Sequence, residues 1–230
     1  MQNPSPDKVT VIIPAFNEAP EQVEQTLSSL LNRHYRVILV DDGSALPLQP
    51  AAHPLLRIIR HRVNLGQGAA LQTGMDAALQ EGADYIISFD ADGQHEASAI
   101  PALLQPLLEK EADIVFASRF LQAGQHNAGI RRTWLLQLAR RVNFLFTGVM
   151  LSDAHNGLRA MSREAAQKIR LKENRMAHAT EILIRVKQQQ LRLREVPAGV
   201  RYTDYSRNKG QSSLNGFRIL FDLFLHKLFE

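Results

Sequence analysis

Short apolar runs alternate with helical patterns along the first half of the chain. Five runs of strand length, rich in Val and Ile, predict strands over residues 9–13, 36–42, 56–61, 84–90 and 113–119. Apolar residues at helical spacing predict helices that begin at Pro20 and that cover 66–82 and 96–110. Because strands that are apolar on both faces are buried on both sides, this pattern is typical of a parallel sheet between two helical layers. We therefore predict an α/β fold with a mostly parallel central sheet and helices on both faces.

The second half of the chain carries two amphipathic patterns. Residues 130–150 hold an apolar stripe at helical spacing, flanked by arginines, and residues 212–230 have a very wide apolar arc. Between them we predict a strand that leads into a helix over 155–165, a helix over 179–190 and strands over 191–202. We expect one domain over 1–212, followed by a C-terminal amphipathic helix over 213–230.

Composition narrows the class of protein. The chain has 230 residues, of which 45% are hydrophobic, which is enough for a domain with a full core. It has no cysteine, so disulfides and thiolate chemistry are excluded. We find neither a secretory signal pattern nor a run of about 18 uncharged apolar residues. A cytoplasmic protein is therefore expected, and its net charge of +4 suits phosphate-bearing ligands or an anionic membrane surface.

Charged residues gather at the predicted carboxyl ends of the strands. Asp41 and Asp42 end the second strand, Asp90 and Asp92 lie at the end of the fourth, and Arg119 ends the fifth. In open α/β sheets, ligands bind beyond the carboxyl ends of the strands. One crevice could therefore collect all of these side chains.

The segment YIISFDADGQH, residues 85–95, is the most informative of these strand ends. Asp90 and Asp92 would point to opposite faces of a strand, but Gly93 allows a turn that brings both to one cation. Mg²⁺ takes oxygen ligands, and Gln94 and His95 could complete or orient the set. A solvated turn explains the same residues without a metal. A calcium EF-hand loop needs glycine at its sixth position and an acid at its twelfth. Counted from Asp90, glycine comes fourth here and Pro101 stands twelfth, so an EF-hand is excluded.

Three other loops carry motifs that are weak individually. PAFNE, residues 14–18, is also an ordinary strand-to-helix loop in which Asn17 could cap the helix, and DDGS, residues 41–44, is also an Asp-Gly turn. NLGQGAALQTG, residues 64–74, matches the dinucleotide-binding fingerprint poorly, because its third glycine comes too late. Its glycines either let the backbone approach a ligand, which Gln67 would face, or allow close helix–sheet packing.

Taken in chain order, the four motifs resemble those of the inverting family 2 glycosyltransferases, which have the GT-A fold. P-A-F-N-E, D-D-G-S, N-x-G-x-G and D-A-D-G-Q each follow a predicted strand. The resemblance is greatest to the polyprenol-phosphate mannosyl- and glucosyltransferases of the dolichol-phosphate mannose synthase type, and it covers about residues 8–210. It implies a nucleotide-sugar-binding half over 8–120 and an acceptor half over 121–212.

The resemblance also implies roles for individual residues. Those implied to lie at the nucleotide-sugar donor are Pro14, Ala15, Asn17, Glu18, Asp41, Asp42, Gln67, Gly68 and Ala91. Asp90 and Asp92, with Gln94 as a further ligand, are implied to hold Mg²⁺ or Mn²⁺ on the donor diphosphate. Two anionic ligands fix a cation, which then neutralises the leaving group as it departs.

Three further segments match the lipid-phosphate subgroup of the family. They are ASRF over 117–120, DAHNGLRAMSRE over 153–164 and YSRNKGQSS over 205–213. The last contains Arg207 but has Ser213 where the subgroup usually has lysine. For Arg119 the competing interpretation is a solvated strand end, and for Arg159 it is a structural salt bridge.

The implied reaction is a single in-line displacement at the anomeric carbon. A lipid-phosphate acceptor is already anionic near neutral pH, so it needs positioning more than deprotonation. Arginines suit that task because their planar fork binds phosphate through two hydrogen bonds, and the candidates are Arg119, Arg131, Arg132 and Arg207. A hydroxyl acceptor would instead need a carboxylate base, for which Asp153 is the first candidate and Glu181 the second.

A polyprenyl-phosphate acceptor would place the protein at the inner face of the cytoplasmic membrane. The segments 130–150 and 213–230 could lie in the membrane interface, or they could pack on the core or form a homodimer interface. Rival functions are transfer to a hydroxyl acceptor in cell-envelope polysaccharide synthesis, and nucleotide-sugar binding without turnover. Binding of nucleic acid is not expected, because no aromatic–basic motif supports it.

Overall fold

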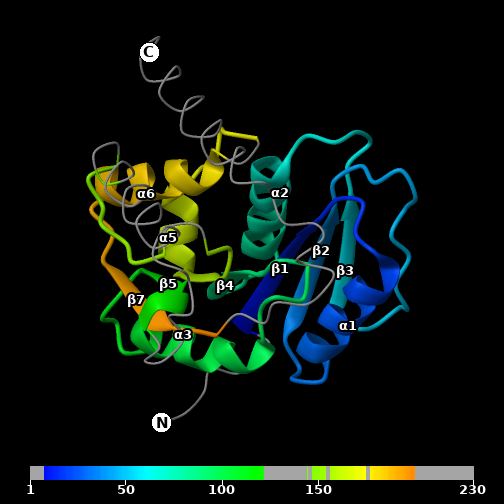
Figure 1. Ribbon diagram of the computed structural model, residues 1–230, viewed down its shortest axis with the longest axis horizontal. Coiled ribbons are helices and arrows are strands. Elements are labelled where there is room, and N and C mark those ends of the chain that lie inside the picture. The colour runs from blue at the N-terminus through cyan, green and yellow to red at the C-terminus, as the bar shows by residue number, and fades with distance from the viewer. Residues whose placement is uncertain (1–7, 122–143, 145–146, 154–155, 175–176, 200–230) are drawn as a thin grey trace, which may run out of the picture.

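The predicted alternation of strands and helices is confirmed in the computed structural model, which describes residues 8–121, 144, 147–153, 156–174 and 177–199 (Figure 1). Its strands are β1 (Val9–Ala15), β2 (Arg36–Asp41), β3 (Leu56–Arg60), β4 (Tyr85–Ser88), β5 (Ile114–Ser118), β6 (Arg159–Ser162) and β7 (Leu193–Pro197). Its helices are α1 (Pro20–Leu31), α2 (Gln67–Gln80), α3 (Ile100–Leu108), α5 (Arg163–Lys168) and α6 (His178–Gln188).

The seven strands form one mostly parallel sheet, in the order β3-β2-β1-β4-β6-β5-β7. β6 runs antiparallel to both of its neighbours, β4 and β5, and the other pairs are parallel. An antiparallel strand begins at the edge where its neighbours end. The chain that leads into β6 therefore arrives at the carboxyl ends of β4 and β5, beside the predicted crevice.

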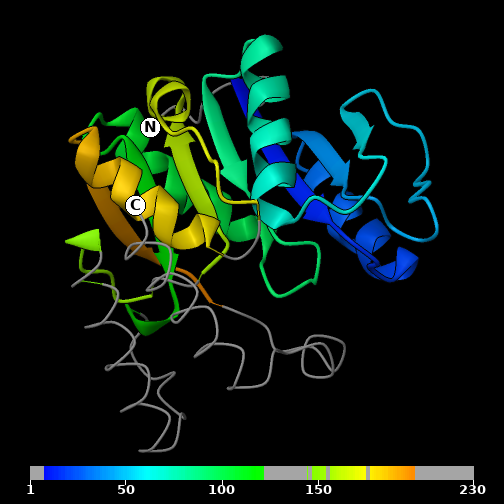
Figure 2. The ribbon, with the colours of Figure 1, turned by 90° about the horizontal axis from the view of Figure 1, so that it is seen from above.

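Helices cover both faces of the sheet, as predicted. α1 and α3 lie on one face, and α2, α5 and α6 lie on the other (Figures 1 and 2). Residues of β1 alternate between the two cores: Val11 and Ile13 pack with α1 and α3, and Ile12 packs with α2. A Cβ on Gly74 would lie 2.3 Å from Ile12 Cγ2, so this glycine of α2 serves close helix–sheet packing.

The carboxyl end of β1 differs from the prediction in one detail. Pro14 lies inside β1, opposite Val40 of β2, rather than ending the strand. Ile12 O accepts a hydrogen bond from Phe89 N, just past the last residue of β4. A backbone N–H at residue 14 would point toward β4 as Ile12 O does, because backbone groups two residues apart in a strand point the same way. The missing N–H of Pro14 is therefore tolerated, because β4 has already ended where it would be needed.

Several residues and segments for which the sequence predicts a role lie outside the described residues. These are Arg131, Arg132, Arg207, most of the segment 130–150 and the whole of 213–230. Membrane contact and dimer formation through these two segments therefore stay predictions. In the described ranges, no helix has both the length and the apolar character needed to cross a bilayer.

Candidate active site

The turn that carries Asp90 and Asp92 leaves the sheet earlier than predicted. β4 ends at Ser88 rather than at residue 90, and Gly93 has φ = 72°, a conformation that favours glycine. The two carboxylates therefore lie on a turn and not on opposite faces of a strand. Both carboxylates can face one cation only on such a turn, and the sequence predicted a turn here.

Asp90 is surrounded by hydrogen-bond donors and positive charges. Its Oδ1 accepts a bond from Gln67 Nε2, and its Oδ2 lies next to His95 Nε2, both at 3.3 Å. Burial acts to raise the pKa of Asp90, but the bond and charge of His95 and the charges of Arg159 and His178 lower it overall. The carboxylate is therefore ionised at neutral pH. Its side chain is 28% exposed, so a ligand can reach it.

Asp92 has the opposite electrostatic surroundings. Burial and the charge of Asp90 raise the pKa of Asp92, and Glu18 contributes in the same direction. Its two oxygens accept bonds from Gln94, from the backbone N–H at 3.0 Å and from Nε2 at 2.7 Å. Gln94 thus orients Asp92, which is one of the two roles considered for it. Negative charge therefore accumulates around Asp92, on which both Asp90 and Glu18 act.

Asn17 connects the loops that follow β1 and β2 and does not cap α1. Its side-chain Oδ1 accepts a bond from Ala45 N at 2.9 Å, and its own N–H donates to Ser44 Oγ at 2.9 Å. The residue that precedes α1 is Ala19, which makes no side-chain cap. The prediction that Asn17 caps the helix is therefore wrong, because its side-chain amide bonds to the loop after β2 instead. Its backbone adopts the left-handed conformation, with φ = 52°.

Asp41, at the end of β2, is 1% exposed and binds the loop that follows it. Its carboxylate accepts bonds from the N–H groups of Ser44 and Leu48, and from Arg60 Nη1 at 2.5 Å. Burial acts to raise the pKa of Asp41, but the Ser44 and Leu48 bonds and the charge of Arg60 lower it overall. The structure thus places Asp41 beneath the loop, and its predicted contact with the donor stays a prediction.

Asp42 organises the segment that leads into α2. Its carboxylate is 3% exposed and accepts bonds from Asn64 Nδ2, from the N–H groups of Leu65 and Gly66, and from His61 Nδ1 at 2.7 Å. His61 Nε2 bonds in turn to Thr73 Oγ1 at 2.9 Å. The loop after β3 and the start of α2 are therefore fixed by one aspartate.

The amino end of α2 packs against another segment of the chain. Gly68 N–H donates to Asn174 O at 2.8 Å, and a Cβ on Gly68 would lie 1.9 Å from Glu173 O. The packing explanation thus accounts for Gly68, whereas Gln67 faces Asp90. Glu181 holds the same segment by accepting bonds from the N–H groups of Lys172 and Glu173.

Arg119 and Asp153, which are far apart in the sequence, form a bidentate ion pair. Arg119 Nε donates to Asp153 Oδ2 and Nη2 donates to Oδ1, both at 2.7 Å. The backbone N–H of Arg119 adds a third bond to Oδ2, at 3.1 Å. Glu195 of β7 accepts from the N–H groups of Ser152 and Asp153, and so fixes the acidic partner.

The segment before β6 joins the Asp90 turn to this ion pair. Asn156 Nδ2 lies 3.4 Å from Asp153 Oδ2, and Gly157 O accepts a bond from Ser88 Oγ at 2.7 Å. Gly157 is in turn packed against the Asp90 carboxylate, because a Cβ there would lie 2.0 Å from Oδ2. The predicted donor and acceptor clusters are therefore neighbours.

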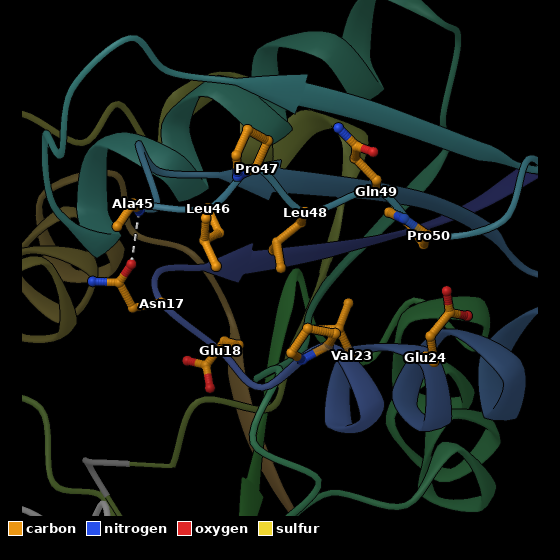
Figure 3. A pocket seen from close by; sticks show the side chains of 11 residues that line it. Asn17, Glu18, Val23, Glu24, Ala45, Leu46, Pro47, Leu48, Gln49 and Pro50 are labelled. Carbon is orange, nitrogen blue, oxygen red and sulfur yellow. Dashed lines mark hydrogen bonds between the residues drawn. The ribbon is translucent and has the colours of Figure 1, made fainter.

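A cavity of about 270 Å³ opens between the loop after β1 and the loop after β2 (Figure 3). Its apolar walls are formed by Pro20, Val23, Leu46, Pro47, Leu48 and Pro50, and its polar residues include Asn17, Glu18 and Glu24. The Asn17–Ala45 hydrogen bond closes one end (Figure 3). The loops that form this cavity are those predicted to bind the nucleoside.

Comparison with known proteins identifies the family. The family described as glycosyl transferase family 2 matches residues 10–170, more than half of the chain. The chain belongs to glycosyl transferase family 2. It is therefore a glycosyltransferase, as the motifs predicted.

Two relatives match this glycosyltransferase along nearly its full length. An uncharacterized protein of Methanocaldococcus jannaschii is 36% identical over 229 residues, which is 97% of this chain and 93% of the relative. The UDP-N-acetylglucosamine–dolichyl-phosphate N-acetylglucosaminyltransferase of Methanococcus voltae is 30% identical over 243 aligned positions, which cover 96% of each chain.

A solved structure confirms the GT-A fold of this glycosyltransferase. Glucosyl-3-phosphoglycerate synthase of Mycobacterium tuberculosis, in complex with Mn²⁺, uridine diphosphate and phosphoglyceric acid, matches with a TM-score of 0.65. The match covers 94% of this chain and 78% of that one, at 19% identity. At this identity the likeness shows the fold alone.

The residues of this glycosyltransferase fit a cation that is shared with a substrate. Within the described ranges, no three His, Asp or Glu side chains are grouped so that they could hold a metal ion by themselves. Mg²⁺ is usually bound by one or two carboxylates together with substrate phosphates. Asp90 and Asp92 supply two carboxylates. Burial and the charge of Asp90 raise the pKa of Asp92, and a cation would favour its ionised form.

Sequence reasoning missed some residues of this glycosyltransferase that shape the site. Arg60 ends β3 and His61 follows it, so their position at a strand end is the signal that also marks Asp41. Glu195 gave no local signal, because its partner Ser152 is 43 residues away in the sequence.

Proposed function

We propose that this glycosyltransferase moves a hexose from a nucleotide-sugar, of the GDP-mannose or UDP-glucose type, to a polyprenyl phosphate. The ion pair between Arg119 and Asp153 carries this proposal. It lies beside the Asp90 turn, and it leaves the best-placed carboxylate committed to an arginine rather than available as a base.

The acceptor class follows from this commitment. A hydroxyl acceptor must lose a proton, so it needs a carboxylate that can accept one. Both oxygens of Asp153 already accept bonds from Arg119, and Glu181 is bound to the backbone of residues 172 and 173. A phosphate acceptor carries its own negative charge and needs only to be positioned. Arg119, whose guanidinium is fixed by Asp153, is suited to that role.

The donor side of the proposal rests on the turn after β4. Asp90 and Asp92 would hold Mg²⁺ or Mn²⁺, which supplies neutralisation of the departing diphosphate when it is bound. Gln67 and His95 hold Asp90, and Gln94 holds Asp92, so the ligands are oriented before the donor arrives. The loops around Asn17 and Asp42 would enclose the nucleoside beside the cavity of Figure 3.

The chemical step is one displacement. A bond forms between an oxygen of the acceptor phosphate and the anomeric carbon, and the bond from that carbon to the donor diphosphate breaks on the opposite face. The products are an inverted glycosyl phosphate lipid and a free nucleoside diphosphate. No proton has to move in this step, in keeping with the absence of an available base among the residues named above.

The known chemistry of a relative supports the lipid acceptor. The Methanococcus voltae enzyme is named for transfer to dolichyl phosphate, and it aligns with 96% of this chain. A polyprenyl-phosphate acceptor places our protein at the inner face of the cytoplasmic membrane, with residues 8–120 as its donor half and 121–212 as its acceptor half. Peripheral attachment through 130–150 and 213–230 is part of this proposal.

A donor-by-acceptor assay tests the proposal. Purified protein with Mn²⁺ or Mg²⁺ is given GDP-mannose, UDP-glucose or UDP-N-acetylglucosamine, with and without undecaprenyl phosphate, and the released nucleoside diphosphate is measured. We expect one donor to give release that requires the lipid. Release that is equally fast with a saccharide acceptor and no lipid would contradict the polyprenyl-phosphate acceptor and support a hydroxyl one.

A further inference from the structure

Arg159 is a buried arginine at the junction of the two halves of the site. It is the first residue of β6 and is 2% exposed. In the sheet, Arg159 pairs with Ser88 of β4 and with Phe116 of β5. Ser88 lies two residues before Asp90 in the sequence, and Phe116 lies three residues before Arg119. The guanidinium carbon of Arg159 lies 5.4 Å from the centre of the Phe116 ring. The chain therefore places a positive charge between the metal turn and the Arg119–Asp153 pair.

The guanidinium of Arg159 is not used as a buried arginine normally is. Its Nε is buried and lacks a hydrogen-bond partner among the residues that the structure describes. The structural salt bridge that the sequence suggested is also not formed with any described residue. Buried charges are usually paired and hydrogen-bonded, so this one needs another explanation.

The charges that face Arg159 are carboxylates on either side. Burial lowers the pKa of Arg159 to about 10, while Asp90 and Asp153 act to raise it. At neutral pH the guanidinium is therefore still protonated. It interacts with both carboxylates through space, without a direct ion pair to either.

We propose that Arg159 is a positioning residue that serves as the shared counter-charge of Asp90 and Asp153, with which a divalent cation competes at Asp90. This inference deepens the proposed function and rests on its metal site. In the metal-free protein, Arg159 neutralises part of the charge on Asp90. When a cation binds Asp90, the guanidinium and the cation repel each other, and the arginine interacts more strongly with Asp153.

The proposal predicts an unusual sign for the effect of losing this residue. A merely structural arginine would, when removed, leave the metal affinity unchanged or weaken it by disordering the turn. A competing positive charge would, when removed, strengthen the affinity of Asp90 and Asp92 for the cation. For charges several ångströms apart in a partly buried site, the expected gain is roughly tenfold.

The test is a titration of the full chain with Mn²⁺ alone, in which electron paramagnetic resonance measures free Mn²⁺. Arg159→Met should bind Mn²⁺ roughly tenfold more tightly than the wild type, and its thermal stabilisation by Mn²⁺ should be larger. Arg159→Lys, which keeps the charge, should bind within about twofold of the wild type. Arg192→Met, which removes an exposed arginine paired with Asp113, is the matched control and should bind like the wild type.

A second variant keeps the test decisive if Arg159→Met does not fold. Asp153→Asn removes the other carboxylate, so the whole charge of Arg159 then acts on Asp90, and Mn²⁺ binding should weaken. Wild-type affinity or weaker binding in Arg159→Met, or unchanged binding in Asp153→Asn, would overturn the inference alone. Failure of the wild type to bind Mn²⁺ in a way that Asp92→Asn abolishes would overturn the metal site, and this inference with it.

Discussion

Gly157 lies so close to the carboxylate of Asp90 that no residue with a Cβ fits at position 157 unless the carboxylate moves. A Cβ at position 157 would lie 2.0 Å from Asp90 Oδ2 and 2.5 Å from Cγ, well inside contact distance. The segment that leads from Asp153 into β6 thus sets the position of the carboxylate on the neighbouring turn. The contact joins the segment before β6 to the turn that carries Asp90 and Asp92.

Gly157→Ala should therefore displace the Asp90 carboxylate. Because the backbone φ of Gly157 is outside the left-handed region, the added methyl group acts by contact and not by backbone strain. We expect transfer activity to fall by about a hundredfold, since misplacement by about 1 Å costs that much. The free energy of unfolding should change by only about 1 kcal/mol. Steady-state kinetics and thermal denaturation measure the two quantities.

Gly82→Ala is the matched control for this prediction. Gly82 has φ = 82° and no atom within contact distance of an added Cβ, so alanine there strains the backbone without touching the site. It should cost roughly 1 kcal/mol of stability and leave activity unchanged. If Gly157→Ala lost no more activity than this control, the close contact between Gly157 and Asp90 would not contribute to transfer activity.

Asp153→Asn separates the two possible roles of this residue. If Asp153 orients Arg119, the variant should lose roughly tenfold in kcat/KM and keep a pH profile of the same shape. If Asp153 were the general base for a hydroxyl acceptor, activity should fall by about a thousandfold or more, and the acidic limb of the profile should disappear. Rates measured between pH 5 and 9 distinguish the two outcomes.

Asp41→Asn should destabilise the protein in a pH-dependent way. The pKa of Asp41 is lowered in the folded state: burial acts to raise it, but the bonds from Ser44 and Leu48 and the charge of Arg60 outweigh burial. A lowered pKa stabilises the fold above the unfolded pKa of about 4, and this stabilisation is lost as the pH falls through the folded pKa. The variant should cost about 1.5–3 kcal/mol at pH 7, since it weakens the charge-assisted bonds that the buried Asp41 carboxylate accepts from the loop and from the exposed Arg60.

Chemical denaturation at several pH values measures this effect. The difference in the free energy of unfolding between the wild type and Asp41→Asn should be largest at neutral pH and should shrink below about pH 4. A difference that stayed constant from pH 7 to pH 3 would show that the ionised carboxylate of Asp41 is not what holds the loop.

The fold was largely predictable because its strands are apolar runs with clear limits. The sequence also predicted that Asp90, Asp92 and Arg119 would lie at one edge of the sheet. It could not predict that β6 runs antiparallel between β4 and β5, because nothing local in RAMS sets strand direction. Without β6, the contact between Gly157 and Asp90 cannot be foreseen.

Side-chain partners were harder to predict than positions. Asn17 was expected to cap α1, but tertiary contact with Ala45 is made instead. Asp153 is predicted as the base for a hydroxyl acceptor, but in the structure it pairs with Arg119. Its backbone N–H donates to Glu195, which lies in a strand that is distant in the sequence. Such pairings are set by packing, for which a single sequence carries no periodic signal.

We propose that Asp90 and Asp92 support transfer of a sugar from a nucleotide donor to a lipid phosphate. The most direct measurement is mass spectrometry of the lipid fraction after incubation with donor, Mn²⁺ and undecaprenyl phosphate. We predict a glycosyl phosphate lipid with the wild type, and none above background with Asp92→Asn, whose folding is verified by circular dichroism. A glycosylated lipid formed equally well by Asp92→Asn, or a wild type that releases nucleoside diphosphate without forming any such lipid, would contradict the account.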